Sequence, residues 1–275
     1  MQLFGTDGVR GQISLESLQN PFLSFCENRF FSPMLVEGII RGCISSLPDT
    51  LTSLTAIIGF DARPNQAPLV EAAVRTVVEA GGQCLIIGPC TTPQLIQSGL
   101  QNKVDVMWMF TASHNPASDS GIKWFDSNGR KSMPEDELNV ELNYDCNIKG
   151  IFGKDGFSKN ITSQEASFRE RLVENYVSNL SHWLGIDNVI PEQEMVFYLD
   201  AANGEAAIGI DLALQHLGFK TIRVDGYGLI NESCGAAGLE PGKIWSWSDL
   251  SSSKHKLFHR LYKERITFKE RIGHL

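Results

Sequence analysis

Apolar runs alternate with amphipathic stretches between residues 54 and 110, and this alternation is typical of one class of fold. Three short apolar runs have the length of buried strands: 54–60, 84–87 and 104–110. Two intervening segments carry apolar residues at helical spacing: 67–80 and 92–100. Strands that alternate with helices predict a mostly parallel sheet covered by helices on its faces, which is an α/β fold.

A second, smaller α/β unit is predicted in the C-terminal half. Its expected elements, in chain order, are a long amphipathic helix, a strand, a helix and a strand, over 163–184, 195–199, 206–217 and 221–224. A further helix is expected over 32–47, because Ser32-Pro33 combines a capping residue with a first-turn proline. Residues 143–162 are polar and punctuated by glycine, and are interpreted as a surface loop or linker.

The charge distribution marks a boundary near residue 237. Residues 241–275 hold eight Lys/Arg and three Asp/Glu, whereas residues 1–240 hold 16 and 29. A length of 275 residues is compatible with roughly two domains. We therefore predict a first domain over 1–150, a second over 151–236 and a basic tail over 237–275.

Composition excludes several classes of protein. Hydrophobic residues make up 42% of the chain, which is enough for a sizeable core, and a net charge of −8 argues against nucleic acid as a partner. No apolar run is long enough to span a membrane, and the N-terminus lacks the pattern of a signal peptide. The six cysteines form no CxxC pair, so we expect reduced thiols and a cytoplasmic location.

Polar side chains gather where the predicted strands end. Ser113 and His114 follow the strand that ends at residue 110, and Arg63 follows the strand that ends at residue 60. Ligands bind at the carboxyl ends of strands in such sheets, so a serine hydroxyl near Arg63, His114 and Lys123 suits phosphate chemistry. The alternative is that Ser113 and His114 are only turn residues. A hydrolase triad is disfavoured, because no GxSxG surrounds Ser113.

Three motifs taken together resemble the α-D-phosphohexomutase family in identity, order and spacing. They are FGTDGVRG at 4–11, TASHNP at 111–116 and GIK at 121–123. The first of these, and INESCGA at 230–236, look most like the phosphoglucosamine mutase branch of that family. Residues 91–93 and 199–204 also fit. The resemblance implies a three-layer, mostly parallel α/β domain, followed by an incomplete second α/β domain.

The resemblance also implies an activity, in which a phosphoryl group moves between the 6- and 1-positions of a hexose. Ser113 would be carried as phosphoserine and would form a sugar bisphosphate intermediate. For the phosphoglucosamine mutase branch the substrate would be glucosamine 6-phosphate and the product glucosamine 1-phosphate, a precursor of UDP-N-acetylglucosamine. Phosphomannomutase or phosphoglucomutase activity is the alternative within the family.

Roles for individual residues follow from the same resemblance. Magnesium would bridge the phosphate on Ser113 and neutralise developing charge. Arg10 would lie near that phosphate, with a structural ion pair as its alternative role. Lys123 would assist proton transfer at the sugar hydroxyl, unless it is an ordinary surface lysine. His114 would bond the phosphate or brace the loop, with bracing favoured, and Arg63 is expected to support the loop.

The chain also departs from the family pattern. The family's magnesium loop, Asp-Gly-Asp-Gly-Asp-Arg, does not occur in this sequence, and neither do the later sugar-recognition and phosphate-binding loops. Magnesium would then have only the phosphoserine and water, although it usually takes carboxylates too. We expect a truncated chain whose tail is a frameshift product or a real basic segment. Its activity and oligomeric state stay open, and a non-catalytic fragment that binds a partner is the competing hypothesis.

Overall fold

The computed structural model describes residues 3–5, 7–161, 174–179, 181–182, 196–223 and 228–232, with residues 246 and 248. It divides into two compact units, formed by Met1–Ser113 with Ser118–Tyr176, and by His114–Ala117 with Val177–Leu275. The domain bounds 1–150 and 151–236 stay predictions. The tail, 237–275, lies outside the described residues except at 246 and 248.

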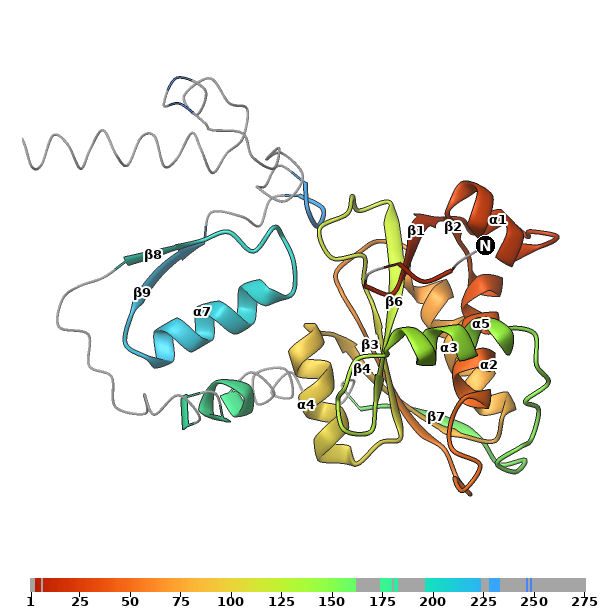
Figure 1. The fold of residues 1–275 in the computed structure, drawn as a ribbon. Helices are drawn as coiled ribbons and strands as arrows, with labels where there is room; N and C mark the ends of the chain where they lie inside the picture. The colour runs from red at the N-terminus through yellow and green to blue at the C-terminus, as the bar shows by residue number, and fades with distance from the viewer. Residues whose placement is uncertain are drawn as a thin grey trace, which may run out of the picture. The chain divides into compact units, whose positions relative to one another are not determined.

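A seven-stranded sheet forms the centre of the first unit, with the strand order β2-β1-β6-β5-β3-β4-β7 (Figure 1). The strands are β1 (Val9–Ile13), β2 (Phe30–Phe31), β3 (Thr55–Phe60), β4 (Gln83–Pro89), β5 (Val106–Phe110), β6 (Asp119–Asp126) and β7 (Phe157–Asn160). Among these strands, β6 runs antiparallel to its neighbours β1 and β5, and the other neighbouring strands pair in parallel. The predicted mostly parallel sheet is confirmed.

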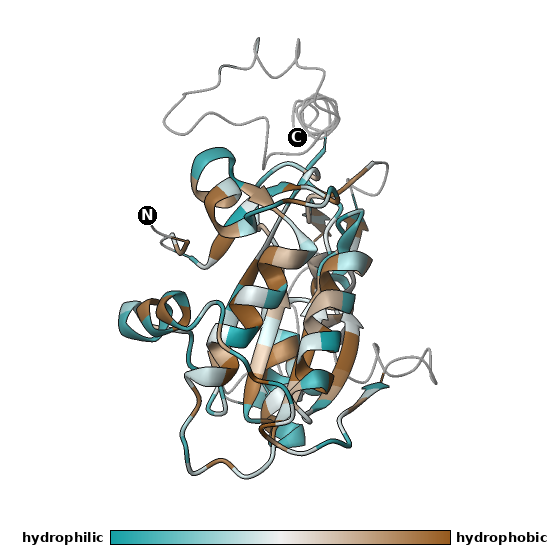
Figure 2. Cartoon of the chain, turned by 90° about the vertical axis from the view of Figure 1, so that its right-hand side faces the viewer, coloured by the Kyte–Doolittle hydropathy of each residue, from teal (hydrophilic) through white to brown (hydrophobic). Residues whose placement is uncertain are grey.

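Helices cover both faces of this sheet. They are α1 (Pro21–Asn28), α2 (Pro33–Ser45), α3 (Gln66–Glu79), α4 (Thr92–Asn102) and α5 (Pro134–Leu142). In Figure 1, α4 lies on the face opposite α2, α3 and α5. In Figure 2 the helices carry hydrophobic and hydrophilic residues in alternation, as amphipathic helices do. The predicted three-layer α/β arrangement is therefore present.

Alternation along the central strands fills two separate cores. Val106, Trp108 and Phe110 of β5 join the larger core, which includes buried residues of α2 and α3. Met107 and Met109 of the same strand join the smaller core, beneath α4. Successive side chains of a strand point to opposite faces, so a strand buried on both sides reads as a continuous apolar run. This is why β3 and β5 were recognisable in the sequence.

Local capping fixes where two of the helices begin. The Ser32 hydroxyl accepts a hydrogen bond from the Leu35 N–H (3.2 Å), and Pro33 occupies the first turn of α2. At α4, the Gln94 N–H donates to the Thr91 hydroxyl (3.4 Å), and the Thr91 N–H donates to the Gln94 side chain (2.8 Å). These bonds satisfy N–H groups that have no partner inside the helix. The helix expected over 32–47 is confirmed as α2.

The interpretation of residues 143–162 as a loop or linker holds for 143–156, which form neither helix nor strand, and is wrong for 157–160. Strand β7 lies within this segment and pairs in parallel with β4 at the edge of the sheet. Tyr144 and Ile148 are buried against the larger core. The polar composition misled the interpretation because a four-residue edge strand needs few apolar residues, and Phe157 itself is half exposed.

The second unit contains the predicted strand, helix and strand. Strand β8 (Val196–Leu199) pairs in parallel with β9 (Lys220–Arg223), and α7 (Ala206–His216) connects them. The side-chain amide of Asn203 donates to the backbone carbonyls of Leu229 (3.0 Å) and Glu232 (3.1 Å). Two of the segments noted in the sequence, 199–204 and 230–236, therefore lie together where they are described.

Part of the second unit falls outside the description. Of the helix predicted over 163–184, residues 174–179 and 181–182 are described, and they are helical. Residues 195 and 224, at the ends of the two predicted strands, lie outside the described residues. Among the helices that can be described, none has the length and apolar character needed to cross a membrane.

Candidate functional site

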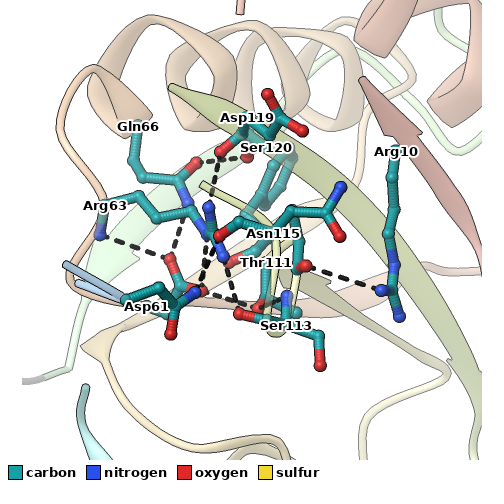
Figure 3. Close-up of polar contacts among 12 residues, drawn as sticks. Arg10, Asp61, Arg63, Gln66, Thr111, Ser113, Asn115, Asp119 and Ser120 are labelled. Carbon is teal, nitrogen blue, oxygen red and sulfur yellow. Dashed lines mark hydrogen bonds and ion pairs between the residues drawn. The ribbon is translucent and has the colours of Figure 1, made fainter. Parts of the chain in front are cut away.

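The loop that follows β5 presents Ser113 at the carboxyl edge of the sheet (Figure 3). Ser113 is exposed, and its backbone lies in the left-handed region at a φ of 55°. Its N–H donates a hydrogen bond to the Thr111 hydroxyl (3.0 Å), and its carbonyl accepts one from Arg63 Nη2 (2.7 Å). The serine is thus displayed to solvent while the peptide groups on both sides of it are held in place.

A buried polar network supports this loop from below. The Asp61 carboxylate accepts hydrogen bonds from the Thr111 hydroxyl (2.6 Å), the Gln66 amide (3.0 Å) and Arg63 Nε (3.1 Å). The Ser120 hydroxyl donates to the Gln66 side chain (2.9 Å), which ties β6 to the same network. All five residues are buried. Buried charges are tolerated when they are paired and hydrogen-bonded in this way.

The sheet topology explains why residues far apart in sequence meet here. Strands β3 and β5 are parallel neighbours, with Phe60 opposite Phe110, and the Asp61 N–H donates to the Phe110 carbonyl (3.1 Å). Arg63 also donates to the Asp119 carbonyl (2.9 Å) at the start of β6. The expectation that Arg63 and Ser113 share one sheet edge is confirmed, and the contacts of Arg63 are those of a loop-supporting residue.

Three cations surround the carboxylate of Asp7 beside this loop. Lys123 Nζ lies 2.8 Å from Asp7 Oδ2, Lys131 Nζ lies 3.0 Å from Asp7 Oδ1, and Arg10 also pairs with Oδ2. Arg10 Nη1 donates to the carbonyl of Ala112 (3.4 Å), the residue before Ser113. We call Asp7, Arg10, Lys123 and Lys131 the Asp7 cluster.

The cations of the Asp7 cluster favour the ionised form of the Asp7 carboxylate. Partial burial acts to raise the pKa of Asp7, but hydrogen bonds and charge from Lys123 and Lys131 outweigh it and lower the pKa to about 2. Asp7 is therefore ionised throughout the physiological pH range. Arg10 forms an ion pair with Asp7, as in the alternative role expected for it from the sequence. It also contacts the serine loop, at the Ala112 carbonyl.

Strand β6 joins the two parts of the site. Arg10 of β1 lies opposite Gly121 of β6, and the Thr111 N–H donates to the Gly121 carbonyl (3.0 Å). A Cβ on Gly121 would lie 2.3 Å from the Val9 carbonyl oxygen, so the close approach of β1 requires glycine here. Arg10, Thr111 and Gly121, one residue from each of the three motifs noted in the sequence, are thus brought together.

The remaining predicted residue, His114, is exposed. Bracing of the loop, the favoured role for His114, stays a prediction. The sequence interpretation did not single out Asp7 or Lys131. Asp7 lies inside a recognised motif, but nothing in that motif identifies its three charged neighbours. They can be identified only when the pairing of β1 with β6 is known.

The described residues do not by themselves fit a magnesium site. Among them, no group of three or more His, Cys, Asp or Glu side chains could hold a metal ion. Two carboxylates near the serine loop are already engaged, Asp61 by Arg63 and Asp7 by the cations of the Asp7 cluster. The assignment of magnesium to a phosphate on Ser113 stays a prediction.

Comparison with known proteins gives consistent similarities. Residues 1–147 match the family described as "Phosphoglucomutase/phosphomannomutase, alpha/beta/alpha domain I". Phosphoglucosamine mutases of Prochlorococcus marinus (strain MIT 9515) and Thermobifida fusca (strain YX) are each 30% identical over 87% of this chain, and the matched regions cover 48% and 49% of those proteins. The chain thus spans about half the length of these curated relatives.

A solved structure has a similar fold. A phosphoglucomutase/phosphomannomutase family protein from Burkholderia thailandensis superposes with a TM-score of 0.57 at 15% identity. The superposition covers 80% of this chain and 43% of that protein. At this level of identity the likeness concerns the fold alone.

Proposed function

The chain belongs to the phosphoglucomutase/phosphomannomutase family, and we propose on this basis that it performs phosphohexomutase chemistry through Ser113. The observation that carries the proposal is the presentation of Ser113. Its side chain is exposed, and its peptide groups are held by Arg63 and Thr111. Arg10 of the Asp7 cluster contacts the preceding residue, Ala112. Phosphoryl transfer depends mainly on such positioning and on charge stabilisation.

The proposed reaction has two half-reactions. In the first, the Oγ–P bond of phosphorylated Ser113 breaks and a new O–P bond forms to the free hydroxyl of a hexose phosphate. One proton leaves that hydroxyl and one is taken up by Oγ, and we assign this proton transfer to Lys123. In the second, the bisphosphate returns its other phosphoryl group to Ser113. Arg10 stabilises charge on the transferred group.

The substrate we propose is glucosamine 6-phosphate, with glucosamine 1-phosphate as product. The names of the curated relatives support this choice, because both are phosphoglucosamine mutases. Phosphomannomutase or phosphoglucomutase activity is the second candidate, favoured by the family matched over 1–147. We also propose that magnesium binds to a phosphate carried on Ser113. A cytoplasmic location is part of the same proposal.

A turnover assay on the 275-residue chain tests the proposal. The assay contains glucosamine 6-phosphate, magnesium and a trace of sugar bisphosphate, with mannose and glucose phosphates as competing substrates. We expect glucosamine 1-phosphate to form, and to be lost in Ser113→Ala but kept in the matched control Ser118→Ala, which removes an exposed hydroxyl nearby. Faster turnover of mannose phosphate or glucose phosphate than of glucosamine 6-phosphate would instead support the second candidate, phosphomannomutase or phosphoglucomutase activity. Equal turnover in Ser113→Ala would refute the role of Ser113.

A further inference from the structure

Asp7 has no part in the proposed reaction, yet it contacts three cations at once. We propose that Asp7 is a positioning residue, which holds Arg10 and Lys123 beside the serine loop, and that Lys131 completes with them a site for a phosphate dianion. The inference rests on the proposed function for its role in catalysis. The contacts themselves belong to the first unit and stand independently of turnover.

The backbone around Asp7 is built to bring its carboxylate to β6. The Gly5 N–H donates to the Gly8 carbonyl (2.9 Å), which closes the chain into a tight turn that contains Asp7. Gly8 has a φ of +81°, and a Cβ at this position would lie 2.4 Å from the Ile122 carbonyl oxygen. Only glycine allows the turn to lie this close to β6. The carboxylate of Asp7 is thereby placed next to Lys123, the residue that follows Ile122.

A second backbone device places Lys131 in the same cluster. Residues 126–130 turn the chain back on β6, so that Lys131 lies opposite Phe125 in an antiparallel bridge. Lys123 and Phe125 are two residues apart on one strand and therefore share a face of it. Lys131 is then the diagonal cross-strand neighbour of Lys123, within reach of the same carboxylate.

The charge of the Asp7 cluster is complementary to a phosphate group. Three cations and one carboxylate leave a formal charge of +2, and a phosphate monoester carries about −1.5 to −2 at pH 7. Without a carboxylate the three cations would repel one another at this spacing. Asp7 lets them stay together when no phosphate is bound. The Lys131 side chain is 34% exposed, so an anion from solution can reach the cluster at this residue.

Amine footprinting tests whether Asp7 holds Lys123. The intact chain is acetylated briefly, and each lysine is quantified by mass spectrometry. In Asp7→Asn we expect labelling of Lys123 to rise roughly two- to fivefold, which is the population change that an ion pair of this kind sustains. Asp7→Glu should restore much of the protection. The exposed Lys103 serves as internal reference, and Asp49→Asn, which alters an exposed aspartate, as the matched control. Unchanged labelling of Lys123 in Asp7→Asn would overturn the positioning role.

Phosphate protection tests the anion site in two arms. In the first arm, inorganic phosphate is added to Ser113→Ala, which carries no phosphoserine, and in the second the phosphorylated chain is labelled without added phosphate. We expect protection of Lys123 and Lys131 in at least one arm, and weaker protection of Lys123 in Lys131→Gln. The first arm identifies a free phosphate as the ligand and the second identifies the phosphate on Ser113. Absence of protection in both arms overturns the site, whereas a chain without turnover that still shows protection refutes only the proposed function.

Discussion

At the scale of single residues, Ser113 adopts a conformation that its neighbours must maintain. A non-glycine residue in the left-handed region costs on the order of 1–3 kcal/mol when the surroundings impose it. Thr111 and Arg63 bind the two peptide groups of Ser113, and Asp61 binds both of these residues. Buried side chains therefore hold the exposed Ser113 hydroxyl in position, and they do so without bound substrate.

Replacing Arg63 by methionine should reveal this dependence. Arg63→Met leaves the Asp61 carboxylate buried without its cation and frees the Ser113 carbonyl. Breaking one side of a buried pair costs about 3–5 kcal/mol, so we expect a loss of this order in the free energy of unfolding, measured with urea. The control is Arg75→Met, where a mostly exposed arginine pairs with Glu37 and the expected loss is below about 1 kcal/mol. Equal losses would contradict the network.

The carboxyl group of Asp7 should titrate far below its usual range. Its pKa falls from 3.8 to about 2 in the folded chain, so the stabilisation from its ion pairs is complete above pH 3.8 and disappears as the pH falls through about 2. Carbon-13 NMR of the Asp7 side chain should follow this titration directly. In the double variant Lys123→Met, Lys131→Met the pKa should rise. An ordinary aspartate pKa in the unmodified chain would show that the cluster does not form in solution.

The residues of the site were only partly predictable from sequence. Ser113, Arg63 and Lys123 stood in recognisable positions, after strands or within motifs, and the structure brings them to one region of the sheet. Asp7 and Lys131 could not be identified because their relation depends on the pairing of β1 with β6 and on the turn at 126–130. Side chains joined only by tertiary pairing leave no periodic signal in the sequence.

At the scale of elements, burial decided which strands could be predicted. Strands β3 and β5 are buried on both faces and read as apolar runs, so they were found within one or two residues of their ends. Strand β1 reads VRGQI and β6 reads DSGIKWFD, with glycines and charges that belong to the site. These residues allow close approach of the backbones and place charged groups at the site, so neither strand has the apolar pattern from which a strand is predicted.

The glycine that lets the N-terminal turn approach β6 should be intolerant of substitution. Gly8→Ala adds a Cβ 2.4 Å from the Ile122 carbonyl oxygen at a residue whose φ is +81°. We expect destabilisation of more than about 1 kcal/mol in urea unfolding, together with increased labelling of Lys123 as the turn moves away. Gly5→Ala, in the same turn, would meet its nearest atom at 3.7 Å and should be nearly neutral. A neutral Gly8→Ala would show that the turn has another conformation.

At the scale of the whole molecule, every residue assigned to chemistry except His114 lies in the first unit, which has its own sheet and two cores. The chain spans about half the length of its curated relatives, so the activity of the whole protein remains a proposal. The packing of the first unit can be tested separately within the whole chain, because the cysteine thiols of this unit differ sharply in burial.

Thiol labelling should follow burial in the first unit. Burial raises the pKa of Cys43 and of Cys84 to about 12, so both should resist a thiol reagent at pH 8 until the unit unfolds. Cys26 and Cys146 are partly exposed and should react first. Mass spectrometry of the labelled peptides identifies each site, and labelling in urea provides the control for complete reactivity. Early labelling of Cys43 or Cys84 in the native chain would contradict the packing described.

Transfer of a phosphoryl group from a sugar bisphosphate to Ser113 can be measured directly by radioactive labelling. The chain is incubated with a hexosamine bisphosphate labelled with phosphorus-32, digested, and the labelled peptide sequenced by mass spectrometry. We expect label on Ser113, its loss in Ser113→Ala and its retention in Ser118→Ala. Label on another residue, no label, or label that persists in Ser113→Ala would refute phosphoryl transfer to Ser113.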